Sequence, residues 1–215
     1  MSLKALQDGT SGTYIDVKVS KDGFLLTQDY VQAQVIKGNV YHAYFGSATT
    51  PATLDASYAA TDPDISIDIS DGRLILPLRI VVVMEAYGTT ALFETFCLCS
   101  RTLAAASAGT AFVPINMRTR TGGGSNCSVY TAPTVTDGNT TGAFELFRNT
   151  QAKAVTIATA IDTSTWQHNV TEWNYLKDAP APVLEGNASL QIWAICQAAT
   201  GYISIYWLEL GENDI

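Results

Sequence analysis

The apolar residues of this chain recur mainly at every second position, which is the spacing of a β-strand with one buried face. Isoleucines alternate with polar residues in Ile65–Ile69, and apolar residues resume the alternation in Leu74–Ile80. The turn between them is Asp71-Gly72, and Asp-Gly between two alternating runs is a strong hairpin signal. We therefore predict a hairpin here, and by the same reasoning another over 15–26, around Lys21-Asp22-Gly23.

Two further apolar runs, Ser189–Cys196 and Tyr202–Leu210, are joined by Gln197–Gly201 and predict a third hairpin. Both runs carry large apolar side chains on both faces. Such strands lie in the middle of a sandwich or at an oligomer interface. Further strands are expected at 38–46, 91–100, 110–118, 127–136 and 153–160.

The fold class that this pattern predicts is all-β, a sandwich or a barrel. Only weak helical patterns occur, at 100–108 and 147–155. We expect residues 1–36 to form a semi-independent N-terminal arm or short hairpin that contacts the capsid or a neighbour. Residues 37–215 form the main domain.

The composition adds that much of the surface is uncharged or covered by partners. Charged residues make up only 15% of the 215 positions and apolar residues 47%, whereas a typical soluble domain is about 25% charged. The net charge is -8 and the twelve basic residues are scattered, which disfavours nucleic acid as a partner. The longest apolar run, Ile80–Met84, is far too short to cross a bilayer, so no membrane partner is expected.

The segment Met117–Asn126, MRTRTGGGSN, has the composition of a loop that could bind a phosphate or an oxyanion. A nucleotide-binding phosphate loop requires a Lys after its glycines and a helix after the loop, and neither follows here. We therefore expect a glycine-rich connection between two strands. Arg118 and Arg120 alternate on one face of the preceding strand, which makes them candidates for a salt bridge to a partner.

The acidic run Asp62–Asp71 lacks the spacing of a calcium-binding EF-hand. In a strand, Asp64 and Asp68 share one face with Ser66 and Ser70, so we interpret this as a solvated face. A weak calcium site at Asp62 and Asp64 is the alternative.

The sequence displays no catalytic residues and no cofactor site. Its two histidines, His42 and His168, have no recognisable nucleophile motif nearby. Cys97 and Cys99 lie two positions apart on a predicted strand and face the same side, which indicates a small apolar pair in the core. A zinc site formed with Cys127 or Cys196 is the less favoured interpretation.

Aromatic residues gather at Trp166, Trp173 and Tyr175, close to Asn, Gln and Asp. Such a group can stack on sugar rings or anchor a protein–protein contact. We favour the protein contact.

Four short segments carry a resemblance to known proteins: Thr49–Pro51, Gly72–Gly88, Pro114–Arg118 and Trp207–Glu209. In this order they resemble motifs of a widespread group of virion structural proteins of tailed bacteriophages. The resemblance extends over roughly 45–215 and identifies a class more specifically than a role. It implies a jelly-roll β-sandwich that forms a homotrimer on the outer surface of the virion head.

Head decoration proteins, also called cement proteins, often look like this. They occupy quasi-threefold positions of the capsid and tie major capsid proteins together. The resemblance therefore implies a non-enzymatic protein whose partners are copies of itself and the major capsid protein. It assigns no residues to these contacts; Arg118 and Arg120 are candidates on the strand pattern alone. The alternative is a head-fibre, collar or tail adsorption protein that binds host glycans through the aromatic group. A hydrolase, the third hypothesis, needs an acid/base pair that the sequence does not display.

Overall fold

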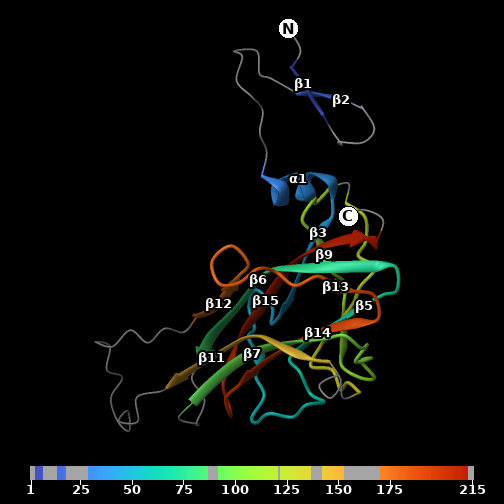
Figure 1. The fold of residues 1–215 in the computed structure, drawn as a ribbon. Helices are drawn as coiled ribbons and strands as arrows, with labels where there is room; N and C mark the ends of the chain where they lie inside the picture. Colours follow the sequence, from blue (N-terminus) through green and yellow to red (C-terminus); the bar gives the residue numbers. More distant parts are fainter. Residues whose placement is uncertain are drawn as a thin grey trace, which may run out of the picture.

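Two antiparallel β-sheets packed face to face make up most of the molecule (Figure 1). The computed structural model describes residues 3–6, 14–17, 29–86, 92–120, 122–136, 142–152 and 170–212. The predicted all-β class and the sandwich are confirmed. In the described residues one short helix accompanies the strands, and no helix there is long and apolar enough to span a membrane.

The elements are β1 (Leu3–Leu6), β2 (Tyr14–Val17), α1 (Tyr30–Lys37), β3 (Val40–Phe45), β4 (Ala52–Thr53), β5 (Ile65–Ile69), β6 (Arg73–Ala86), β7 (Leu92–Ser100), β8 (Thr110–Phe112), β9 (Ile115–Asn116), β10 (Ser128–Thr131), β11 (Phe144–Ala152), β12 (Val170–Asn174), β13 (Leu184–Glu185), β14 (Ala188–Ile195) and β15 (Thr200–Gly211).

The first sheet has six strands in the order β11-β7-β14-β5-β10-β8. The second has the order β12-β6-β15-β3-β9, with β13 paired to β6 and β4 paired to β15. Strands β1 and β2 pair with each other in a separate two-stranded sheet. The strands β14 and β15 lie inside the first and second sheets respectively, as their two-sided apolar pattern predicts.

The hairpin predicted around Asp71-Gly72 is wrong. Strand β5 pairs with β10 and β14 in the first sheet, whereas β6 pairs with β12, β13 and β15 in the second. The turn therefore carries the chain from one sheet to the other. The connection from β14 to β15 does the same, so the third predicted hairpin is also wrong. Alternation shows that one face of a strand is buried, but two strands that face the same core from opposite sheets share this pattern with a paired hairpin.

Three of the other predicted strands are present, one is split between the two sheets, and one lies outside the described residues. The strands expected at 38–46, 91–100 and 127–136 are β3, β7 and β10. The strand expected at 110–118 is split: β8 belongs to the first sheet and β9 to the second. Residues 153–160 lie outside the described residues. In the expected 15–26 hairpin, the described strand β2 pairs with β1, and residues 18–26 are also outside.

Helix α1 was not predicted. Asp29 caps its start by accepting a hydrogen bond from the Gln32 N–H (3.1 Å), and Gly38 ends it in the left-handed conformation at φ 86°. Val31 and Val35 of the helix pack on apolar side chains of β3, β6 and β15. The expected boundary at residue 36 therefore falls inside a helix that packs on the sandwich. The two weak helical patterns are not helices where the structure describes them. Ser100 ends β7 and 101–108 is irregular, while 147–152 belongs to β11 and 153–155 lie outside the described residues.

The core between the sheets consists mainly of inward-facing Ile, Leu, Val and Trp side chains. Ile67 of β5, Leu190 of β14 and Ile205 of β15 are fully buried there, together with Trp173 and Trp207. This core leaves each sheet with an outer face. The function of the molecule depends on how those two outer faces and the connecting loops are used.

Candidate functional site

The glycine-rich loop 117–126 surrounds a buried carboxylate of the chain itself. Glu209 of β15 is only 5% exposed. Ser125 Oγ donates a hydrogen bond to its Oε2 (2.6 Å), and the Asn126 backbone N–H and Nδ2 donate to its Oε1 (2.9 and 3.0 Å). A buried carboxylate is stable only when donors replace the water that it has lost. The anion that this loop binds is therefore the side chain of Glu209.

Asn116, at the end of β9, fastens the same loop from its other side. Its Nδ2 donates to the carbonyl oxygens of Gly38 (2.7 Å) and Gly123 (2.9 Å), and its Oδ1 accepts from the Arg118 N–H (2.8 Å). A Cβ at Gly122 would lie 2.2 Å from Asn116 Cγ. Only glycine therefore lets the loop pass this close to the asparagine.

The two anchors belong to segments that carry the phage-protein resemblance, Pro114–Arg118 and Trp207–Glu209. In this structure Asn116 and Glu209 hold a loop in place. The sequence analysis missed Glu209, although a signal was present. It follows Ile203, Ile205 and Trp207 at a spacing of two, and an acid on an inward-facing position needs dedicated partners.

Arg118 and Arg120 do not share a strand face, so this part of the prediction is wrong. Strand β9 ends at Asn116, and both arginines lie in a turn closed by a hydrogen bond from the Gly122 N–H to the Arg118 carbonyl (3.0 Å). The chain leaves the strand here because Asn116 bonds the loop backbone in place of a continuing ladder. Both arginines are exposed, and neither has an acidic partner within the described residues. Their contact with a partner stays a prediction.

The outer face of the second sheet carries a patch of valines and tyrosines beyond the part that α1 covers, with Glu172 beside Val81 and Arg79 beside Tyr206 on the same face. Cross-strand neighbours on this face are Tyr202 beside Val83, which lies beside Val170, and Tyr44 beside Ser204, which lies beside Val81. Tyr44 is 37% and Val170 43% exposed, and the other members are half-buried. We call this surface the valine–tyrosine face, defined by Tyr44, Val81, Val83, Val170 and Tyr202.

An antiparallel sheet with one face on the core usually places polar residues on the other. The outer face of the first sheet is not exposed to water in this way, because other segments of the chain cover it. Trp193 Nε1 donates to the Ala59 carbonyl (3.0 Å), and the Ala104 N–H donates to Ser189 Oγ (2.7 Å). The segments 55–64 and 100–109 thus close the outer face of the first sheet, and the valine–tyrosine face of the second stays open.

This cover overturns the solvated acidic face predicted for β5. Asp64, Ser66 and Asp68 are buried. Asp68 accepts hydrogen bonds from the Ala106 N–H (3.1 Å) and from Ser189 Oγ (3.1 Å). The alternation is as predicted, but the polar side of the strand binds a loop and not water.

Two carboxyl groups under this cover have raised pKa values. Burial raises the pKa of Asp64 well above its usual range, the nearby Asp55 raises it further, and a hydrogen bond from the Ala194 N–H opposes both. Burial, together with the charge of Asp62, raises the pKa of Asp55 to about 6. The calcium alternative at Asp62 and Asp64 gains no support, since no group of three or more potential metal ligands occurs among the described residues.

The other candidate ligands lie in the core or outside the described residues. Cys97 and Cys99 face the core together, as predicted, and burial raises the pKa of the Cys97 thiol. Among the described residues these cysteines belong to no group of three or more potential metal ligands, so the zinc interpretation gains no support. His42 stacks on Tyr206 at 4.3 Å between ring centroids, and burial lowers its pKa. His168 lies outside the described residues.

The aromatic group does not form a sugar-binding surface at Trp173. This side chain is 2% exposed, because its position opposite Ile80 turns it into the core. Tyr175 is partly buried against the same core, and Trp166 lies outside the described residues. The expectation that Trp173 contacts a glycan or another protein is therefore wrong.

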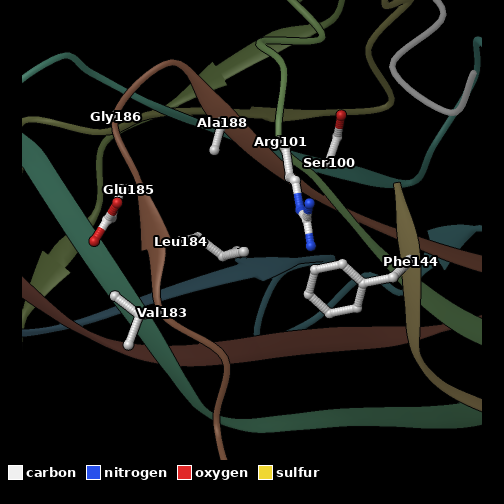
Figure 2. Close-up of a pocket in the computed structure, with 8 residues that line it drawn as sticks. All are labelled: Ser100, Arg101, Phe144, Val183, Leu184, Glu185, Gly186 and Ala188. Atoms are coloured by element: carbon white, nitrogen blue, oxygen red, sulfur yellow. The ribbon is translucent and has the colours of Figure 1, made fainter. Parts of the chain in front are cut away.

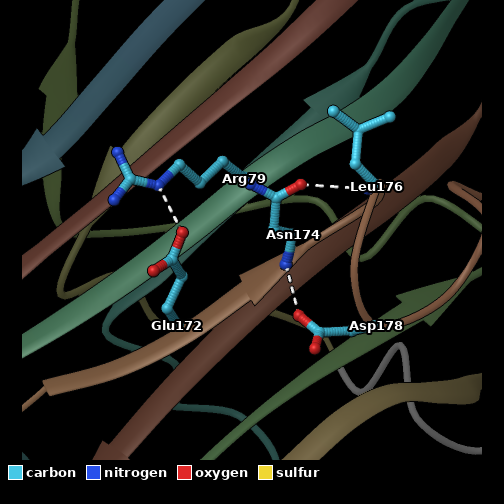
Figure 3. A network of polar contacts seen from close by, with 5 residues as sticks. All are labelled: Arg79, Glu172, Asn174, Leu176 and Asp178. Atoms are coloured by element: carbon cyan, nitrogen blue, oxygen red, sulfur yellow. Dashed lines mark hydrogen bonds and ion pairs between the residues drawn. The ribbon is translucent and has the colours of Figure 1, made fainter.

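The turn that follows β12 is held by its own polar contacts (Figure 3). Asn174 accepts a hydrogen bond from the Leu176 N–H at Oδ1 (2.9 Å) and donates its backbone N–H to Asp178 Oδ2 (2.7 Å). Beside it, Arg79 and Glu172 form an ion pair at 2.8 Å across β6 and β12. These contacts give the edge of the valine–tyrosine face a fixed shape.

Comparison with known proteins adds no family to this description: no family model matches the chain, and no curated protein matches it. The structure defines the class as an all-β sandwich of two antiparallel sheets. Its distinguishing surface features are the open valine–tyrosine face and the anchored loop 117–126.

Proposed function

We propose that this chain is a non-enzymatic structural protein of a bacteriophage particle, a decoration protein that binds the outside of the head as a homotrimer. The observation that carries the proposal is the valine–tyrosine face. One outer face of the sandwich is closed by the chain's own loops, whereas the other presents valines and tyrosines outward. The resemblance to phage virion proteins supplies the class, and the face supplies a reason for self-association.

The jelly-roll form of the sandwich is part of the proposal. Support comes from the path of the main strands, which repeatedly cross from one sheet to the other: β5 to β6, β6 to β7, β8 to β9 and β14 to β15. Crossing of this kind distinguishes a jelly roll from a meander of hairpins. It also explains why both Asp-Gly and the C-terminal connection misled the hairpin prediction.

Burial of the valine–tyrosine face would stabilise a trimer. A fully buried apolar side chain contributes about 1.5–3 kcal/mol, and association costs reduce the sum of such terms. A chain with only 15% charged residues also has few charges that would oppose a dry interface. In the trimer the face packs against neighbouring copies.

Capsid contact is assigned to the N-terminal hairpin and to the loop 117–126. An isolated pair such as β1 and β2 is marginally stable in water, so a partner surface would stabilise it. Arg118 and Arg120 supply exposed cations on an acidic protein, and they pair with carboxylates of a major capsid protein or of a neighbouring subunit. A protein that binds only the assembled shell stabilises that shell by mass action.

The first test is the mass of the isolated protein in solution. We expect three chains per particle for the wild type and one chain for Val83→Asp, because a carboxylate cannot enter a dry interface without a partner. Leu103→Asp is the matched control, since Leu103 is 43% exposed and lies in the segment 100–109, which covers the outer face of the first sheet. A monomeric wild type, or a trimeric and folded Val83→Asp, contradicts the assembly mode.

The second test concerns the particle. Heads that lack this protein should release their DNA at a lower temperature or after milder osmotic shock, and addition of purified wild-type protein should restore the resistance. Equal resistance with and without the protein would refute the cement role. The burial of Trp173 argues against the glycan-binding alternative. A glycan array of the wild type, with Trp166→Ala as the control, tests whether Trp166 binds a glycan.

A further inference from the structure

A pocket of about 460 Å³ opens at one end of the sandwich, away from the valine–tyrosine face. The end of β7, the start of β11 and the segment that runs through β13 to the start of β14 form its walls (Figure 2). This volume lies within the usual range for small-molecule sites, about 300–1,000 Å³.

Arg101 is the only cationic residue among those that line the pocket. Figure 2 shows its side chain extended into the pocket, with the guanidinium between Leu184 and the ring of Phe144. The stem lies along Gly142, where an added Cβ would be 3.4 Å from Arg101 Cδ. The guanidinium has no ion-pair partner within the described residues. Arg101 is exposed, and its guanidinium hydrogen-bond donors have no acceptor among the described residues.

The neighbouring acids do not neutralise Arg101. The carboxylate of Glu185, which also lines the pocket, points away from the guanidinium in Figure 2. Glu145, next to Phe144 in the sequence, is engaged by Arg148 at 2.6 Å. The apolar part of the lining comes from Phe144, Val183, Leu184 and Ala188, and Ser100, Glu185 and Gly186 complete the pocket wall.

We infer that this pocket binds a small carboxylate that carries an apolar or aromatic body. The guanidinium matches a carboxylate with two parallel hydrogen bonds, and the aliphatic and aromatic lining takes the hydrocarbon part. An ion without an apolar part would leave this lining in water. A neutral ligand such as an amide could accept a hydrogen bond but would lack the charge that pairs with the guanidinium. The inference does not depend on the decoration role, because the pocket is formed within one chain.

The test uses 3-phenylpropionate as the probe and 3-phenylpropanamide as its uncharged counterpart. Binding is followed by the chemical shifts of backbone amides in the full-length protein. We expect saturable binding of the acid with a Kd on the order of 1 mM, as for other ligands of this size. The shifts should concentrate at 100–102, 144 and 183–188. The amide should bind at least about tenfold more weakly, since it lacks the charge-assisted hydrogen bonds.

Two variants locate the binding energy. Arg101→Gln should weaken the acid about tenfold and leave the amide unchanged, whereas Lys177→Gln removes an exposed charge elsewhere and should change neither. Melting curves confirm that both variants fold. The inference is overturned if the wild type does not bind the acid, if acid and amide bind equally, or if Arg101→Gln binds the acid as the wild type does. Shifts that concentrate away from the pocket would also overturn it.

Discussion

Replacing Glu209 by glutamine removes the charge that the loop 117–126 surrounds and leaves the side chain nearly unchanged in size. The carboxylate accepts three hydrogen bonds, from Ser125 Oγ and from two nitrogens of Asn126. In the variant one carboxylate oxygen becomes an NH₂ group, so either the two Asn126 donors lose their acceptor or Ser125 Oγ must accept a hydrogen bond in place of donating one. A hydrogen bond to a charged group contributes about 1.5–3 kcal/mol. Relief of the buried charge offsets part of this loss, so we expect the free energy of unfolding to fall by about 2 kcal/mol.

The assay is urea unfolding of the wild type and of Glu209→Gln, followed by tryptophan fluorescence. Hydrogen exchange provides a local measurement, in which the amide of Asn126 should lose protection in the variant because its acceptor is weakened. Glu185→Gln, on an exposed side chain, is the matched control and should change stability by no more than about 0.5 kcal/mol. A change of that small size in Glu209→Gln, with the Asn126 amide still protected, would refute the anchoring role.

Two further predictions concern the same loop and the covered carboxyl groups. Gly122→Ala should cost about 1–3 kcal/mol, because the new methyl group would overlap Asn116, whereas Gly123→Ala meets open space and should be nearly neutral; urea unfolding of both variants checks the difference. Asp55 has a pKa raised to about 6 in the folded protein, so the native state binds a proton that the unfolded chain releases near pH 4. Its contribution to stability is therefore fully present below about pH 4 and is lost as the pH rises through about 6. Asp55→Asn should flatten this dependence between pH 4.5 and 7.5, and an identical pH slope in the variant and the wild type would show that Asp55 is not responsible.

The strands were predictable because alternation records which residues face the core, and this requirement acts on each strand separately. The partner of a strand is a property of the whole fold. Ile65–Ile69 and Leu74–Ile80 alternate as a hairpin would, yet they pair in different sheets. Nothing in a local pattern of period two distinguishes a turn within a sheet from a turn between sheets. The same limit applies to Asp68, whose polar side is covered by a segment almost forty positions away, at Ala106.

The candidate site was predictable only in part. The composition of Met117–Asn126 raised the possibility of an anion-binding loop, but the sequence analysis predicted a plain glycine-rich connection. The loop does surround an anion, the side chain of Glu209, which lies more than eighty residues along the chain. Arg118 and Arg120 were expected to share a strand face and to contact a partner. The strand ends at Asn116, so the shared face is wrong, and the partner contact stays a prediction. Helix α1 is eight residues long, too short for its periodicity to stand out, so only its caps could have indicated it.

The most direct test of the central claim is a cryo-electron microscopy map of the phage particle that carries this protein. A decoration protein predicts three copies of the sandwich around each occupied quasi-threefold position on the outer surface of the head, joined through their valine–tyrosine faces. Density for the sandwich on the tail or collar, or copies that contact one another through other surfaces, would contradict this account.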